Sequence, residues 1–159
     1  MITALSSIAS QQSKGTEKTY ADTIWLFNYA ATYPNANIRY TASDMILYIH
    51  SDASYLSEPQ ACSHAGSHYF LGDERPYITT PPTNRPRLNE PIHPISRIMS
   101  NVMVSAAKAE IVAAYSNSQE DVRILTLLRK LGHPQPATPI QVDKSTADSF
   151  SNDTIKRNG

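Results

Sequence analysis

The sequence predicts a single α/β domain with a mixed sheet, antiparallel first strands and flanking helices. A segment with helical spacing comes first, two β-type runs at hairpin distance follow it, and an alanine-rich helical pattern then leads into a short strand. A length of 159 residues with 40% hydrophobic side chains suits one domain plus a short appendage. This order of elements is the α/β pattern in which helices cover a sheet.

The first predicted helix lies at about residues 21–31, after a Ser- and Gln-rich start. Tyr20, Ile24, Phe27 and Ala31 recur at the spacing of one helix face, and Pro34 ends the pattern. We interpret the pair Tyr20 and Ile24 as core residues, because apolar pairs at this spacing usually pack against the body of a domain.

Three strands are predicted next. Residues 45–49 (MILYI) are bulky and partly β-branched, and the run ends at residues 50–52, which places Asp52 at the strand end. Residues 67–72 form a second strand candidate, and the Pro-, Arg- and Thr-rich residues 73–91 read as a long loop. Residues 92–99 are a weaker candidate, expected at a sheet edge because Pro94 lacks a ladder donor.

Two helices and a strand complete the pattern. Ser105 is a good N-cap for a helix over residues 106–115, and a second helix over residues 119–131 places Ile124, Leu127, Leu128 and Leu131 on one face. We interpret the pair Leu127 and Leu131 as core residues. Gly132 stops the second helix, and residues 138–143 then read as a short strand before a polar, helix-like tail.

Composition excludes several classes of protein. The chain has 14 basic residues (Lys and Arg) and 14 acidic residues (Asp and Glu), so its net charge does not indicate binding to nucleic acid. No run is long enough to span a bilayer, and the polar N-terminus lacks the pattern of a signal peptide, so we expect an intracellular protein of the cytoplasm or nucleus that is not secreted. Cys62 is alone, which excludes an internal disulfide.

The histidines do not indicate a zinc site. His64 and His68 are four residues apart, but a zinc pair at that spacing requires a helix, and this segment reads as a loop entering a strand.

Three carboxylates occupy positions where chemistry is often placed: Asp52 after the first strand, Glu110 early in a helix, and Asp143 at the end of the last strand. Each has an ordinary alternative. Asp52 and Asp143 suit turns or caps, and Glu110 suits a solvated helix start. Together they suit a pair of divalent metal ions, which need several converging oxygen ligands.

The local sequences add a family resemblance. Residues 49–55 (IHSDASY), 105–114 (SAAKAEIVAA) and 141–147 (QVDKSTA) resemble, in order, the three acidic motifs of the ribonuclease H domain in the Pol polyprotein of copia-like LTR retrotransposons. The resemblance covers about residues 45–153, and the leading helix resembles the segment that ends the reverse transcriptase. It implies a helical connection segment at residues 1–40 and a ribonuclease-H-like domain at 41–159, lacking its last C-terminal elements.

The function implied by this resemblance is two-metal hydrolysis of RNA in RNA-DNA hybrids. Asp52, Glu110 and Asp143 would be the catalytic residues and the ligands of Mg²⁺. The implied partners are an RNA-DNA hybrid and the rest of the Pol polyprotein, with no membrane.

The chain departs from the family pattern at three places. Lys108 stands where the family has a Glu, and Lys144 stands where it has an Asn. The family's fourth acid has no counterpart, since neither Asp148 nor Asp153 matches its position. The second metal is therefore the one most affected. These departures leave open whether the chain is an enzyme, a catalytically inert remnant that at most binds nucleic acid or protein, or an unrelated α/β interaction domain.

Overall fold

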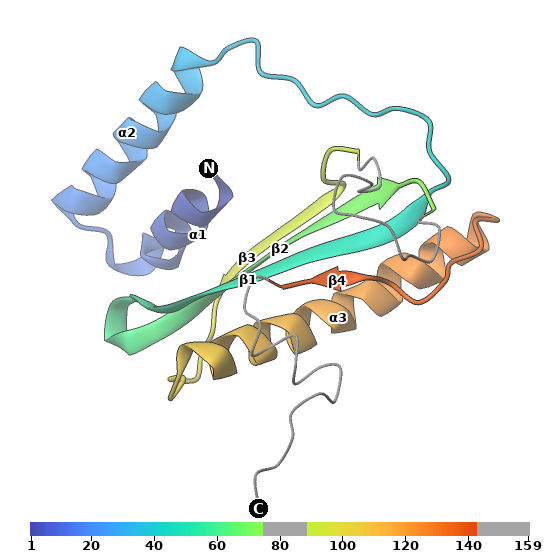
Figure 1. The fold of residues 1–159 in the computed structure, drawn as a ribbon. Coiled ribbons are helices and arrows are strands. Elements are labelled where there is room, and N and C mark those ends of the chain that lie inside the picture. The colour runs from blue at the N-terminus through green and yellow to red at the C-terminus, as the bar shows by residue number, and fades with distance from the viewer. Residues whose placement is uncertain (75–88, 143–159) are drawn as a thin grey trace, which may run out of the picture.

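The computed structural model describes residues 1–74 and 89–142 of the chain. In chain order the elements are α1 (Ile2–Ser10), the 3-10 turn η1 (Gln12–Lys14), α2 (Glu17–Thr32), β1 (Ile46–Glu58), the 3-10 turn η2 (Pro59–Ala61), β2 (Cys62–Gly72), β3 (His93–Ile98), α3 (Ala106–Lys130) and β4 (Ile140–Gln141). Figure 1 shows α3 along one side of the sheet and α1 with α2 on the other side.

The sheet has the strand order β3-β2-β1-β4. β1 and β2 pair antiparallel, as do β2 and β3, whereas β4 is parallel to β1 with Ile140 beside Ile49. A parallel partner requires a crossover connection, and α3 supplies it between β3 and β4. The mixed α/β class and the antiparallel first strands are thus confirmed, as is the edge position of β3.

β1 is longer than predicted, which changes the position of Asp52. The ladder with β2 continues without a break through Ser51↔Ser67, Asp52↔Gly66 and Ala53↔Ala65. Asp52 therefore lies inside the strand, and its predicted place at the strand end is wrong. The sequence after Ile49 has low β-propensity, but pairing with a neighbouring strand overrides this preference.

α3 is one continuous helix, so the prediction of two helices over residues 106–115 and 119–131 is wrong. The break was expected at residues 116–118 (SNS), which are poor helix formers. Asn117 lies there with its side chain bonded to the sheet, and this contact holds the weak segment in the helix. The ends are confirmed: Ser105 Oγ accepts from Lys108 N at 3.2 Å, and Gly132 has φ 89°.

The N-terminal segment forms two helices, although only the second was predicted. α2 begins with a capping box between Thr16 and Thr19 and packs against α1. Tyr20 is 70% exposed and Ile24 is 42% exposed, so their assignment to the core is wrong. The buried positions of α2 are Thr19 and Leu26 instead, because the helix lies beside α1 and not across the sheet.

The apolar core lies between the sheet and α3, in two clusters. One contains Leu47, Ile49, Tyr69, Leu71 and Leu128, and the other contains Ala65, Met99, Met103, Ala109 and Ala113. Within the described residues, no helix is both long enough and apolar enough to cross a membrane.

Candidate functional site

Buried polar residues form a layer beside the two apolar clusters, between α3 and the sheet. On the helix side, Glu110, Asn117 and Asp121 are all buried, and their spacing of seven and four residues aligns them with Leu128 on the stripe of α3 that faces the sheet. On the sheet side, Ser51 and Ser67 are buried opposite each other in the ladder. Burying polar groups costs free energy unless they are bonded, so this layer is the most unusual part of the interior.

Asn117 is the centre of this layer. The side-chain Nδ2 of Asn117 donates to Ser51 Oγ at 2.9 Å and to the carbonyl of Gly66 at 3.1 Å. The backbone carbonyl of Asn117 accepts from the Tyr69 hydroxyl at 2.7 Å. Asn117 is fully buried, and burial also raises the pKa of Tyr69. One helix residue thus ties α3 to both central strands.

Glu110 lies on the same stripe and is 1% exposed. It is adjacent to Ala109, which packs with Ala113 and Ala65 in the second apolar cluster. The alternative that Glu110 is a solvated residue at a helix start is therefore wrong. Lys108, by contrast, is exposed, and its backbone N–H donates to the Oγ of the N-cap residue Ser105. The Lys108 side chain therefore lies outside the buried stripe.

Asp52 projects from the other face of the sheet. Ser51 bonds to α3 and Ala53 packs against the cluster that α3 completes, so both face the helix. Because side chains alternate along an unbroken strand, Asp52 between them faces away from α3. Its carboxylate is exposed, and Oδ1 accepts from Ala53 N at 2.8 Å. The structure therefore places Asp52 and Glu110 on different sides of β1.

Asp143, the third predicted ligand, lies outside the described residues, as do Lys144 and the predicted tail. β4 ends two residues earlier at Gln141, which pairs with His50 of β1. Within residues 1–74 and 89–142, no three His, Cys, Asp or Glu side chains are grouped in a way that could hold a metal ion. The described acids alone thus do not fit a two-metal centre.

Asp121 is an acid of the buried layer, and burial perturbs its protonation. Burial raises the pKa of its carboxyl above the ordinary value, whereas the hydrogen bond from Thr138 Oγ1 at 3.0 Å and the charge of Arg129 act in the opposite direction. The ionised form is therefore disfavoured in the folded chain.

Asp121→Asn is expected to make stability less dependent on pH. The folded pKa of Asp121 is above the unfolded value near 3.8. The contribution of this residue to the free energy of unfolding is therefore fully present below that value, and it is lost as the pH rises through the folded pKa. The stability of the variant relative to wild type should increase from about pH 3 to about pH 7 in urea unfolding. Asp22→Asn, at an exposed ion pair with Lys18, should show no such trend. A relative stability that decreases with pH would contradict the assignment.

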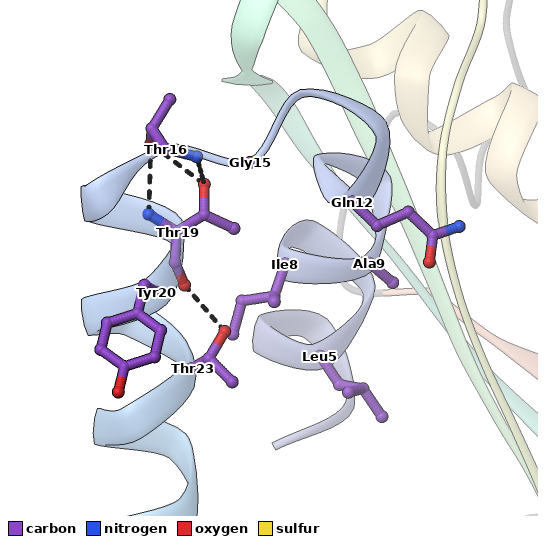
Figure 2. A pocket seen from close by; sticks show the side chains of 9 residues that line it. All are labelled: Leu5, Ile8, Ala9, Gln12, Gly15, Thr16, Thr19, Tyr20 and Thr23. Atoms are coloured by element: carbon purple, nitrogen blue, oxygen red, sulfur yellow. Dashed lines mark hydrogen bonds between the residues drawn. The ribbon is translucent and has the colours of Figure 1, made fainter.

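A separate pocket of about 370 Å³ lies between α1 and α2. Figure 2 shows Leu5, Ile8 and Ala9 on one wall, with Thr19, Tyr20 and Thr23 of α2 opposite them. The Thr23 hydroxyl is turned to its own helix, where it donates to the Thr19 carbonyl at 2.7 Å. The pocket holds no ionisable group other than the Tyr20 phenol. This lining suits an apolar contact better than a catalytic site.

Sequence reasoning missed the polar group on the outer face of the sheet. His64 is 4% exposed, and both of its ring nitrogens have partners, Glu58 and Ser96. No spacing pattern could have found the group, because its members come from three strands. Its only sequence signal is a histidine in a strand.

The fold and site define an α/β protein with a four-stranded mixed sheet and a polar layer under its crossover helix. Comparison with family models, curated proteins and solved structures gave no match for this chain. The function is therefore argued from the residues themselves.

Proposed function

We propose that the chain is a ribonuclease-H-like fragment of a copia-like retrotransposon Pol polyprotein, derived from an enzyme that cleaves the RNA strand of RNA-DNA hybrids. In this proposal Asp52, Glu110 and Asp143 serve that chemistry. Mg²⁺, when bound, would supply an activated water and stabilise charge on the scissile phosphate. The catalytic role of these acids rests on the family resemblance. The acids within the described residues do not by themselves form a metal site.

The observation that carries the proposal is the burial of Glu110 against the sheet. Glutamate is seldom fully buried, so a carboxylate at 1% exposure in the first turns of a crossover helix favours a functional reason for its presence. The connection around it also agrees with the resemblance. Three antiparallel strands lead into α3, and α3 leads into a strand parallel to β1.

A second candidate function is an inert remnant that binds nucleic acid or protein without catalysis. The observation that favours it is the orientation of Asp52, which faces away from the helix that carries Glu110. Ligands of one metal pair must converge, and these two carboxylates do not converge in the described structure.

Cleavage of a labelled RNA-DNA hybrid by the full chain in Mg²⁺ tests the proposal. We expect Mg²⁺-dependent cleavage that falls by about 100-fold or more in Asp52→Asn and in Glu110→Gln, because the stabilisation lost with a metal ligand is several kcal/mol. Asp143→Asn should behave in the same way. The matched control is Glu120→Gln, on the same helix but in an exposed pair with Arg123, which should leave the rate unchanged.

Each outcome separates the two candidates. Absence of Mg²⁺-dependent cleavage in a folded wild-type chain would favour the inert remnant. Cleavage that persists in all three acid variants would mean that the activity belongs to a contaminant or to other residues, and would overturn the assignment of these acids. A melting temperature that rises with Mg²⁺ in wild type but not in Glu110→Gln would support the site independently of turnover.

A further inference from the structure

Three side chains on the outer face of the sheet form a continuous hydrogen-bonded chain. Ser96 Oγ of β3 lies 2.7 Å from His64 Nε2 of β2, and His64 Nδ1 lies 2.9 Å from Glu58 Oε1 at the end of β1. Glu58 and His64 come from the two sides of the turn between β1 and β2, whereas Ser96 is distant in sequence and is brought to His64 by the register of β2 and β3. This is the order of contacts found in hydroxyl nucleophiles activated by a histidine and a carboxylate.

The contacts of His64 favour one tautomer of its neutral ring. His64 is 4% exposed and the Glu58 side chain is 9% exposed, so water competes little for either group. A carboxylate accepts hydrogen bonds, so Nδ1 of the ring carries the proton that Glu58 binds. Nε2 of the neutral ring is then an acceptor, and the Ser96 hydroxyl donates to it. The tautomer is the one that a general base requires.

The backbone groups of Ser96 are directed to the outer edge of β3. Met99 N donates to Ser63 O at 2.8 Å, so positions 63 and 99 form a hydrogen-bonded pair of the antiparallel ladder. Three positions along, Gly66 and Ser96 form a non-hydrogen-bonded pair, so the backbone N–H of Ser96 points away from β2, toward the edge of the sheet that α1 contacts. The Ser96 carbonyl points the same way and accepts from Ser6 Oγ of α1 at 3.0 Å.

Gly66 provides room beside the serine. A Cβ built on Gly66 would meet nothing closer than the Ile95 carbonyl oxygen at 3.9 Å. Gly66 lies opposite Ser96 in the ladder and faces the same side as His64, so open space adjoins the Ser96 hydroxyl. An acyl group of a few carbons has the size to occupy it.

We propose that Ser96, His64 and Glu58 form a hydrolytic relay that acts on carboxylic esters with short acyl groups. Ser96 Oγ attacks the ester carbonyl carbon, and its proton passes to His64 Nε2 while Glu58 stabilises the resulting imidazolium. The alcohol leaves with that proton, and the acyl group stays on Ser96. Water then attacks the acyl-serine with His64 as the base, which releases the acid and restores the hydroxyl. The Ser96 N–H would donate to the oxyanion.

Two measurements on the full chain in EDTA test this proposal independently of any metal-dependent nuclease. A fluorophosphonate probe followed by peptide mass spectrometry should label Ser96, and p-nitrophenyl acetate should be hydrolysed. Ser96→Ala should abolish the labelling, and Glu58→Gln should lower the hydrolysis rate by about 100-fold or more, since the carboxylate orients the ring. The matched control is Ser57→Ala, at an exposed serine of β1, which should leave both unchanged.

A further variant keeps the test decisive if Ser96→Ala or Glu58→Gln fails to fold, as checked by circular dichroism. Gly66→Val adds side-chain volume next to Ser96 without replacing a relay residue, and valine suits a strand. It should lower kcat/KM for p-nitrophenyl butyrate more than for the acetate. Wild-type chain that is folded but not labelled at Ser96 would overturn the proposal, as would equal labelling rates in wild type and folded Glu58→Gln.

Discussion

Asn117→Ala is expected to lower the free energy of unfolding by about 3 kcal/mol, because buried polar groups left without partners cost roughly 1–3 kcal/mol each. The change removes the donor to Ser51 Oγ and to the Gly66 carbonyl in a fully buried position. Alanine is the better helix former, so the loss would come from the lost contacts and not from helix propensity. Urea unfolding followed by circular dichroism measures it.

The control for this variant is Asn28→Ala, at an exposed asparagine inside α2. It makes the same chemical change in a helix without a buried partner, and its effect should stay within about 0.5 kcal/mol. Equal effects at the two positions would show that the bonds between Asn117 and the sheet contribute nothing to stability.

Leu128→Ala is expected to cost about 2–4 kcal/mol, as truncation of a buried leucine leaves a cavity in addition to the lost burial. Leu128 is 4% exposed and belongs to the cluster with Leu47 and Tyr69. Its neighbour Leu127 is 57% exposed. Leu127→Ala is therefore the matched control, with an expected effect below about 0.5 kcal/mol.

This pair also tests which face of α3 is packed. The sequence pattern assigned Leu127 and Leu131 to the core, but both are largely exposed, whereas Leu128 and Ile124 of the same predicted face do pack in the core. If Leu127→Ala cost as much as Leu128→Ala, the helix would be rotated relative to the sheet, and the buried positions of Glu110 and Asn117 would be wrong as well.

The candidate site could be predicted only in part, because its residues are brought together by long-range pairing. Glu110 was singled out by its place early in a helix and by the motif around it, and the structure shows that its side chain is buried. The importance of Asn117 was not predicted, because a polar residue in a helix normally indicates the solvated face. The relay of Ser96, His64 and Glu58 depends on the register of three strands, which no local pattern contains.

The sequence alone determined the α/β class, the helix at the N-terminal segment, the strands around Ile49 and Leu71, and the cap and stop of α3 at Ser105 and Gly132. These features depend on local periodicity, capping and glycine, which act over a few residues. Tertiary structure decided the length of β1, the continuity of α3 and the faces on which Asp52 and Glu110 lie. Cross-strand pairing and the bonds of Asn117 outweigh weak local preferences there, because they are made only after distant segments meet.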